Sequence, residues 1–230
     1  MNYAVILSGG VGSRMGNKNL PKQYMLAMGK PVIVYTLEQF DACPDVDELV
    51  IVANPEWNAQ ILSWVKEYGI QKPVKLAEPG AQRQDSLVSG LLACGSQSED
   101  DLALVHDAAR PLVSAELITR CAEAMVDYDA LVPVTEVRDT VYQSFDGKLV
   151  ENLADRSTLF LGQSPEVFRL QKYLNLNLQA TQEEKDATRG GCEMAFRNGL
   201  KVGMIIGDDC NFKLTTPADM DRLLAYLSRR

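Results

Sequence analysis

The chain has 230 residues, of which 46% are hydrophobic, so it is long enough for one sizeable core and short for two full domains. Its 31 acidic residues outnumber its 23 lysines and arginines, which gives a formal net charge of −8. Sequence-independent nucleic-acid binding depends on a broad basic surface, so this charge argues against it, and an anionic ligand must be met by a few local cations.

The cysteines and the N-terminal residues indicate a soluble protein of a reducing compartment. Met1-Asn2-Tyr3 leads straight into an apolar segment of strand length without a basic leader, and no apolar run approaches ~18 residues. We therefore expect a cytoplasmic protein with no membrane partner. The cysteines are odd in number, scattered and without any Cys-x-x-Cys spacing: Cys43, Cys94, Cys121, Cys192 and Cys210.

The first predicted strand, residues 4–7, leads directly into a glycine-rich segment that carries an arginine. The segment reads Ser8-Gly9-Gly10-Val11-Gly12-Ser13-Arg14-Met15-Gly16, and Pro21-Lys22-Gln23-Tyr24 follows it. Glycine lacks a Cβ atom, so its N–H groups can approach a phosphate closely. A strand followed by such a turn predicts an anion site, although a glycine-rich connection with solvated cations has the same pattern.

Two familiar phosphate-binding loops do not match this segment. A P-loop needs Gly-x-x-x-x-Gly-Lys-Ser/Thr, whereas Asn17 follows Gly16. The dinucleotide fingerprint needs Gly-x-Gly-x-x-Gly, and the spacing from Gly10 to Gly16 is one residue too long. The next predicted strand also ends at Val52-Ala53-Asn54-Pro55, without the acidic residue that would hold a nicotinamide ribose, which argues against an NAD-dependent oxidoreductase.

The next elements alternate between helix and strand, which predicts an α/β fold with three layers and a mostly parallel sheet. Residues 31–40 have helical periodicity, residues 48–53 form a buried strand, a helix opens at residues 54–56, and residues 73–77 form a short strand. The segment Gly80-Ala81-Gln82-Arg83-Gln84-Asp85-Ser86 then opens another helix. A turn, an arginine and a serine at a helix start suit a ligand site, although a capped helix alone explains them equally.

A carboxylate follows the next predicted strand, residues 101–105, in the run His106-Asp107-Ala108-Ala109-Arg110-Pro111. Open α/β sheets bind ligands at the carboxyl ends of their strands, and Asp is a suitable ligand for Mg²⁺, so Asp107 is the candidate metal residue. His106 is the only histidine of the chain. At a strand end it is interpreted as a hydrogen-bonding residue and not as a base.

The pattern changes after a predicted helix at 114–126 and a predicted strand at 129–134. An Asp-Gly turn in residues 144–147 lies between residues 137–143 and 148–151, which predicts a β-hairpin that leaves the sheet as an arm, residues 137–157. Helices are expected from residue 170 and over 192–198, a strand over 201–206 and a closing helix from Thr216-Pro217 to residue 227.

The ordered motifs resemble the sugar-phosphate cytidylyltransferases, in particular the group that contains 2-C-methyl-D-erythritol 4-phosphate cytidylyltransferase and ribitol-5-phosphate cytidylyltransferase. The carriers are the glycine-rich loop with Leu20-Pro21-Lys22-Gln23-Tyr24, the His106 to Pro111 run, Gly162-Gln163-Ser164-Pro165-Glu166, and Asn211-Phe212-Lys213-Leu214-Thr215-Thr216-Pro217. The resemblance covers nearly the whole chain. It implies one Rossmann-like nucleotidyltransferase domain, CTP and a polyol phosphate as substrates, Mg²⁺ or another divalent cation, and a homodimer formed through the arm.

Three positions depart from the family pattern. Ser164 stands for Thr, Glu166 stands for Gln, and Arg189-Gly190-Gly191 stands about where many relatives have Thr-Asp. The last of these departures bears on the acceptor and its local contacts.

The resemblance also assigns residues to roles. Asp107 is assigned to metal binding. The residues assigned to CTP binding are Leu7, Ser8, Gly9, Gly10, Gly12, Gly80, Ala81, Gln82, Arg83, Ser86, Asp107 and Ala108. Acceptor binding falls to Arg110, Thr140, Arg156 and Lys213, with Thr140 and Arg156 presented by the arm to the neighbouring subunit. The catalytic cations are Arg14, Lys22, Arg156 and Lys213, because both reactants are anions and positioned positive charge lowers the barrier.

The acceptor has two candidates. The His106 to Pro111 run favours 2-C-methyl-D-erythritol 4-phosphate, whereas the glycine-rich loop, Asn19 to Gln23 and Gly162 to Pro165 favour D-ribitol 5-phosphate, which we prefer. A catalytically silent nucleotide-binding protein is a further alternative, because Arg189-Gly190-Gly191 departs from the family pattern.

Overall fold

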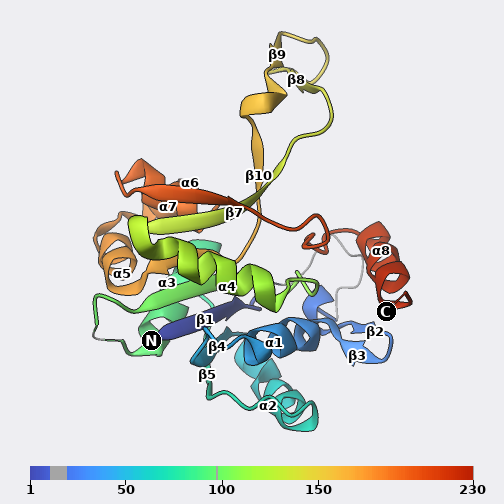
Figure 1. The fold of residues 1–230 in the computed structure, drawn as a ribbon, viewed down its shortest axis with the longest axis vertical. Coiled ribbons are helices and arrows are strands. Elements are labelled where there is room, and N and C mark those ends of the chain that lie inside the picture. The colour runs from blue at the N-terminus through green and yellow to red at the C-terminus, as the bar shows by residue number, and fades with distance from the viewer. Residues whose placement is uncertain (11–19, 97, 230) are drawn as a thin grey trace.

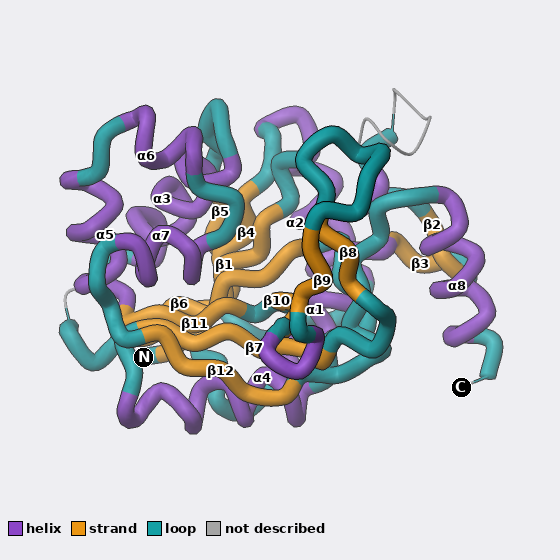
Figure 2. Tube along the Cα trace, turned by 90° about the horizontal axis from the view of Figure 1, so that it is seen from above, coloured by secondary structure: helices purple, strands orange, loops and turns teal. Residues whose placement is uncertain are grey.

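The computed structural model describes residues 1–10, 20–96 and 98–229. Its centre is an eight-stranded sheet within those residues, in which β5, β4, β1, β6, β11, β7 and β12 lie side by side and β10 pairs with the C-terminal end of β7 (Figures 1 and 2). β11 and β10 are antiparallel to their neighbours, and the other pairs are parallel. The bounds are β1 Asn2–Leu7, β4 Glu48–Val52, β5 Val74–Ala77, β6 Leu102–Asp107, β7 Ala130–Glu136, β10 Phe160–Gly162, β11 Glu166–Arg169 and β12 Val202–Ile206.

Helices cover both faces of the sheet, because successive side chains of each buried strand point to opposite sides. In β1, Ala4 and Ile6 pack against one layer of helices, and Tyr3 and Val5 pack against the other. The first layer comprises α1 (Val32–Ala42), α2 (Asn58–Glu67) and α4 (Ala115–Glu123). The second layer comprises α3 (Arg83–Cys94), α5 (Leu170–Gln179) and α7 (Gly191–Arg197), with the short α6 (Gln182–Ala187) beside them. The predicted fold class, a three-layer α/β structure with a mostly parallel sheet, is therefore confirmed.

The parallel register brings the strand ends to one edge of the sheet. Leu7, the last residue of β1, is paired with Val52 of β4 on one side and with Asp107 of β6 on the other. Val52 is in turn paired with Ala77, the last residue of β5. The segments that follow these four strands must therefore leave the sheet side by side, which is the place where open α/β sheets bind ligands.

A small third cluster closes the end of the molecule near α8 (Pro217–Leu227). Its buried members include Ala27, Leu112 and Leu223, and the short pair β2 (Leu26–Ala27) and β3 (Lys30–Pro31) lies beside α8. Thr216 begins α8 with a capping box to Asp219 and a proline in the first turn, as its sequence predicts. This packing holds the chain that precedes α8 against the carboxyl end of the sheet.

The arm is a separate two-stranded sheet that projects from β7 and β10 (Figure 1). β8 (Val141–Gln143) pairs with β9 (Asn152–Ala154), so the second strand begins later than the predicted 148–151. The Asp146 carboxylate accepts the N–H groups of Lys148 and Leu149, which keeps these residues in the turn.

The other predicted elements lie close to their expected positions, but β10, β11, β2, β3 and α6 were not predicted from the sequence. β10 and β11 are short, and their antiparallel direction breaks the alternation on which the prediction depended. In the described part of the chain, no helix combines the length and the apolar character needed to cross a bilayer.

Gly90 tests the contact between α3 and the sheet. A Cβ atom at this position would collide with Val5 Cγ1 and lie 2.9 Å from Val52 Cγ2, and both valines are stiff buried residues. We expect Gly90→Ala to lower the free energy of unfolding by about 1–3 kcal/mol in urea titrations, because overpacking outweighs the better helix propensity of alanine. Ser89→Ala on the same helix is the control, and equal stability of the two variants would contradict the packing described.

Candidate functional site

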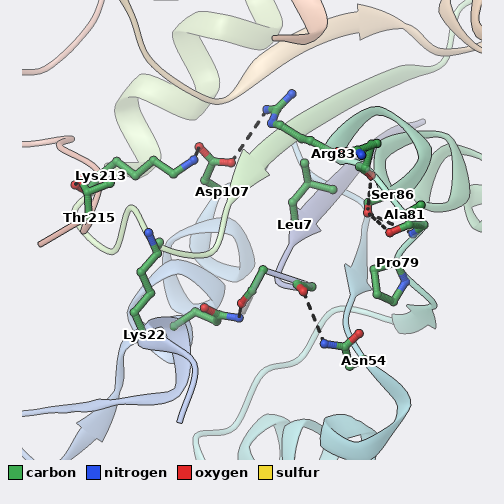
Figure 3. A pocket seen from close by; sticks show the side chains of 16 residues that line it. Leu7, Lys22, Asn54, Pro79, Ala81, Arg83, Ser86, Asp107, Lys213 and Thr215 are labelled. Carbon is green, nitrogen blue, oxygen red and sulfur yellow. Dashed lines mark hydrogen bonds and ion pairs between the residues drawn. The ribbon is translucent and has the colours of Figure 1, made fainter. Parts of the chain in front are cut away.

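A hollow of ≈ 570 Å³ lies at the carboxyl ends of β1, β4, β5 and β6 (Figure 3). It is walled by the residues after β1, the segment that leads into α3, the 3₁₀ turn Lys22–Tyr24 and the chain that precedes α8. The lining residues are Leu7, Gly9, Gly10, Lys22, Gln23, Asn54, Pro79, Gly80, Ala81, Gln82, Arg83, Ser86, Asp107, Ala109, Lys213 and Thr215.

Asp107 stands among three cations in this hollow. Its carboxylate lies 2.9 Å from Lys213 Nζ, 3.6 Å from Arg110 Nε and 3.9 Å from an Arg83 terminal nitrogen. Burial opposes the charged form of Asp107, but Lys213, Arg83 and Arg110 outweigh it and hold the pKa of this carboxyl well below its ordinary value. Figure 3 shows Lys213 and Arg83 reaching the carboxylate from opposite sides. The group is therefore ionised at neutral pH and its cations are held in place.

A buried hydrogen-bond network fixes the end of β6 behind Asp107. His106 is fully buried, and its Nε2 lies 3.1 Å from the Arg110 carbonyl, to which it donates when neutral. Its Nδ1 lies 2.9 Å from Ser164 Oγ. Burial lowers the pKa of His106 to about 4, so the ring is neutral at pH 7 and Nδ1 accepts the Ser164 hydroxyl. His106 thus joins β6 to the segment that precedes β11.

Asn211 continues this network to the segment that carries Lys213. Its side-chain amide donates to the Ser164 carbonyl at 2.7 Å, and its own carbonyl accepts Arg110 at 2.7 Å. The N–H of Leu214 donates to the Ala109 carbonyl at 2.8 Å. These bonds tie residues 211–214 to the loop after β6, which explains why Lys213 lies beside Asp107 although the two are far apart in the sequence.

The segment before α3 forms a tight turn along the opposite wall. The Gly80 N–H donates to Ser86 Oγ at 3.1 Å, and Gln82 and Asp85 form a capping box at the start of α3. A Cβ atom on Gly80 would overlap the side chain of Asp85, and one on Gly9 would lie 2.5 Å from Pro79 Cβ. Glycine is required at residue 9 because the loops after β1 and β5 approach each other closely, and at residue 80 because the turn lies against the first turn of α3.

Two of the departures from the family pattern are explained by one buried group. The Glu166 carboxylate accepts Arg83 at 3.0 Å, the Gly191 N–H at 3.2 Å and the Cys192 N–H at 2.8 Å. A Cβ atom at residue 191 would lie 2.6 Å from Phe168 and 3.1 Å from Glu166 Oε2. The glutamate at 166 and the glycine at 191 therefore fit each other, and together they hold Arg83 at the edge of the hollow.

The structure brings most of the sequence-predicted site residues to this hollow. Lys22 and Lys213 line it together, and nine of the twelve residues assigned to CTP line it as well. Ser8 and Ala108 are buried beside the hollow and are not among its lining residues, while Gly12 and the catalytic candidate Arg14 lie outside the described residues. Arg110 is also absent from the lining, although its Nε lies 3.6 Å from the Asp107 carboxylate.

Thr140 and Arg156 do not reach the hollow of their own chain. Both belong to the arm, and Arg156 donates to the Arg138 carbonyl at the base of the arm. Sequence reasoning also missed several lining residues: Gln23, Asn54, Pro79, Ala109 and Thr215. Asn54 and Pro79 could have been found, because each follows a strand whose carboxyl end lies at the same edge of the sheet.

The donor set suits a metal ion that arrives with a phosphate ligand. Among the described residues, no group of three His, Cys, Asp or Glu side chains could hold a metal ion. Asp107 supplies a single ionised carboxylate inside the hollow. Mg²⁺ in phosphate-transfer sites is commonly bound by one or two carboxylates together with substrate oxygens and water, so this donor set fits such an ion.

The chain is similar along its whole length to one family of known proteins. A family model described as 2-C-methyl-D-erythritol 4-phosphate cytidylyltransferase matches residues 2–229. The chain is 38% identical over 234 residues to the 2-C-methyl-D-erythritol 4-phosphate cytidylyltransferase of Geobacillus thermodenitrificans, which covers 100% of this chain and 99% of that protein. It is 30% identical over 233 residues to the ribitol-5-phosphate cytidylyltransferase of Lactiplantibacillus plantarum, with 100% of both proteins covered.

Solved structures of similar proteins have the same fold. The structure of 4-diphosphocytidyl-2C-methyl-D-erythritol synthase from Anaerococcus prevotii gives a TM-score of 0.83 at 25% identity, over 99% of this chain and 96% of that one. The structure of 2-C-methyl-D-erythritol 4-phosphate cytidylyltransferase from Thermus thermophilus gives a TM-score of 0.75 at 26% identity, with 100% of both chains covered.

The charge balance around Asp107 predicts an acid dependence of stability. The pKa of Asp107 in the folded protein lies below its value of about 3.9 in the unfolded chain. The ionised carboxylate therefore stabilises the folded protein fully above about pH 3.9, and this contribution is lost as the pH falls through the folded pKa. Asp107→Asn should lower the free energy of unfolding at pH 7 by about 1–3 kcal/mol, since it leaves three partly buried cations without their shared partner. The deficit should shrink below about pH 4 in urea titrations. A constant deficit from pH 7 to pH 2 would contradict this, and Asp186→Asn on exposed α6 is the control.

Proposed function

Because the chain belongs to the 2-C-methyl-D-erythritol 4-phosphate cytidylyltransferase family, we propose that it transfers CMP from CTP to D-ribitol 5-phosphate, with release of pyrophosphate. The chain is a nucleotidyltransferase of the cytidylyltransferase class, and its substrates are CTP and a polyol phosphate. The observation that carries the proposal at this site is the pair Lys22 and Lys213, which line one hollow beside the ionised Asp107.

The reaction brings two anions together. A phosphate oxygen of the acceptor forms a bond to the α-phosphorus of CTP, and the bond from that phosphorus to the bridging oxygen breaks, so that pyrophosphate leaves with the electron pair. The protein forms no covalent bond in this reaction. The rate enhancement comes from positive side chains that stabilise the transition state and from the alignment of the two substrates. Lys22 neutralises the triphosphate and the developing charge at the α-phosphorus, and Lys213 binds the acceptor phosphate. Arg14, which lies outside the described residues, is proposed to act with Lys22.

The wall formed by Gly80, Ala81 and Ser86 is proposed to hold the cytosine and ribose. This wall is tight because Gly80 and Asp85 are in close contact, and its turn is fixed by the hydrogen bond from Gly80 to Ser86. A rigid pocket wall of small residues admits a flat base at low entropic cost. Arg83 lies between this wall and Asp107.

Asp107 is the residue proposed to hold a divalent cation. When bound, Mg²⁺ would neutralise phosphate charge and stabilise the developing charge on the leaving pyrophosphate. The low pKa of Asp107 keeps the carboxylate ionised for this role at neutral pH. Lys213 contacts the same carboxylate at 2.9 Å and so lies directly beside the proposed metal position.

The acceptor is proposed from sequence features. Gly162-Gln163-Ser164-Pro165 and the glycine-rich loop favour D-ribitol 5-phosphate. In the structure Gln163 contacts Asp208, and Ser164 contacts His106, so the support from this run comes from its resemblance and not from its position in the hollow. The second candidate, 2-C-methyl-D-erythritol 4-phosphate, is favoured by the His106 to Pro111 run and by the 38% identity to an enzyme named for it.

An acceptor assay decides between these candidates. The purified protein is given CTP, Mg²⁺ and either polyol phosphate, and pyrophosphate release is measured by a coupled enzyme assay. We expect kcat/KM for D-ribitol 5-phosphate to exceed that for 2-C-methyl-D-erythritol 4-phosphate by at least about 10-fold, the selectivity that one or two lost polar contacts produce. The reverse preference would replace the proposed acceptor and retain the enzyme class. Inactivity with both would favour a third acceptor or a silent nucleotide-binding protein.

The two lysines of the hollow give a second test. Lys22→Ala and Lys213→Ala should each lower kcat/KM by about 10² to 10³, because each removes one charge that stabilises the transition state. Thermal unfolding of Lys22→Ala should stay close to that of the wild type, since this side chain is partly exposed. Lys213→Ala should lose some stability because Asp107 loses its nearest cation, so activity is assayed well below its measured unfolding temperature. Lys172→Ala, which removes an exposed lysine of α5 with its own carboxylate partner, is the matched control. Near-normal turnover of a folded Lys22→Ala or Lys213→Ala protein would refute the assignment.

The arm is proposed to complete the site of a second subunit. Arg156 and Thr140 lie on it, away from the hollow of their own chain, and much of its apolar surface is exposed. These exposed apolar side chains are Tyr142, Phe145, Leu149, Val150 and Leu153. A contiguous apolar surface on a projecting hairpin is expected to be covered by a protein partner. A homodimer in which each arm reaches the other hollow would bring Arg156 to the acceptor phosphate.

Complementation tests this arrangement directly. Lys213→Ala and Arg156→Ala are each expected to be inactive as homodimers, while the two chains produced together should recover activity. In a mixed dimer, one hollow receives Lys213 from its own chain and Arg156 from the other, so random assortment gives about a quarter of the wild-type activity. No recovery, in a sample shown by mass spectrometry to contain mixed dimers, would place Arg156 in the site of its own chain or outside any site.

A further inference from the structure

Three successive backbone carbonyls at the start of the glycine-rich segment are held by side-chain donors. The buried amide of Gln23 donates its Nε2 hydrogens to the Ser8 carbonyl at 2.6 Å and to the Gly10 carbonyl at 2.8 Å. The Asn54 amide lies 3.4 Å from the Gly9 carbonyl between them, a contact drawn in Figure 3. The carbonyl oxygens of residues 8–10 are therefore turned toward protein groups.

The direction of the carbonyls decides the direction of the N–H groups. A peptide unit is planar and trans, so its C=O and N–H bonds point opposite ways. The carbonyl of Ser8 belongs to the same peptide unit as the N–H of Gly9, and the carbonyl of Gly9 to that of the N–H of Gly10. The Gly9 N–H group consequently points away from Gln23, and the Gly10 N–H group points away from Asn54. Neither N–H group has a hydrogen-bond partner among the described residues. Gly9 and Gly10 themselves line the hollow.

Gln23 is itself rigidly placed. It lies in the 3₁₀ turn Lys22–Tyr24, between a lysine that lines the hollow and a tyrosine that is buried. The Tyr24 hydroxyl accepts Ser8 Oγ at 2.8 Å, and its ring packs on Trp57 with centroids 4.3 Å apart. The turn thus binds residues 8–10 through Gln23 and Tyr24, and it also carries Lys22, which lines the hollow. The position of the lysine relative to the glycine backbone is therefore fixed.

From this geometry we infer that Gln23 is a positioning residue that fixes residues 8–10, aims the Gly9 N–H group at an oligophosphate and couples it to Lys22, while Asn54 orients the Gly10 N–H group. The inference deepens the proposed function, since it rests on CTP being the nucleotide of this hollow. A bare glycine segment is flexible, and free carbonyls facing the hollow would repel a phosphate. Gln23 removes both obstacles, because it fixes the loop and withdraws two of its carbonyls from the ligand.

The experiment compares two buried amides. Gln23→Met keeps the length of the side chain and removes its donors. Asn177→Leu is the matched control, because Asn177 is equally buried on α5, donates to the Tyr173 carbonyl and lies outside the lining of the hollow. Thermal unfolding is measured for both variants. Isothermal titration calorimetry then gives Kd for inorganic tripolyphosphate, for cytidine and for CTP with Mg²⁺, and steady-state assays give KM for CTP and for the acceptor.

We expect Gln23→Met to weaken tripolyphosphate and CTP by about 10-fold or more, while cytidine and the acceptor KM change less than about 2-fold, because hydrogen bonds to a charged ligand are the ones lost. Asn177→Leu should lose comparable stability without this pattern. The inference is overturned if the two variants show the same ligand affinities, if Gln23→Met weakens cytidine as much as tripolyphosphate, or if the wild type binds no tripolyphosphate. Tripolyphosphate binding that depends on Gln23, without turnover of either acceptor, would reject the proposed activity and support the positioning role.

Discussion

The charge balance around one carboxylate determines the arrangement of the whole site. Asp107 would be costly to place in this half-enclosed position alone, and it is accommodated because Lys213, Arg83 and Arg110 surround it. These cations come from three distant parts of the chain, so their convergence requires the sheet, α3 and the segment before α8 to be assembled together. In the proposed function the same cations face the anionic reactants, so folding and ligand recognition would share one set of charges.

This local balance also explains how an acidic protein can bind polyanions. The net charge of −8 would repel a triphosphate at long range, but in the proposed function Lys22 and Lys213 act on it at contact distance inside the hollow that they line. Glu166 adds a second buried anion beside Arg83, and it is compensated by two backbone N–H groups at the start of α7. Gly191 is needed there because a side chain would meet Phe168 and Glu166. The unusual residues at 166 and 191 are therefore one coupled feature, and this feature preserves the position of Arg83.

Backbone polar groups line the hollow beside the charged side chains. The parallel register delivers the residues after β1, β4 and β5 to adjacent positions, and the contact of Gly9 with Pro79 is possible only because residue 9 has no side chain. Gln23 and Asn54 then fix which polar groups of loop 8–10 remain available. A sheet edge, a glycine pair and two amides thus place next to a lysine two N–H groups, those of Gly9 and Gly10, that have no partner in the part of the chain that the structure describes.

The sequence by itself determined the fold class, most helices and strands, and the identity of the charged residues, because hydrophobic periodicity, glycine runs and capping residues are local signals. It also indicated that Asp107 follows a strand and that Lys213 precedes the last helix. Only the tertiary structure decided which groups meet. The antiparallel β10 and β11, the Glu166 and Gly191 pair, and the hydrogen bonds from Gln23 to Ser8 and Gly10 depend on contacts between segments distant in the sequence or on backbone directions, and no pattern along the chain specifies these. Thr140 and Arg156 lie away from the hollow for the same reason: the path of the arm is set by its pairing with the sheet and not by its own sequence.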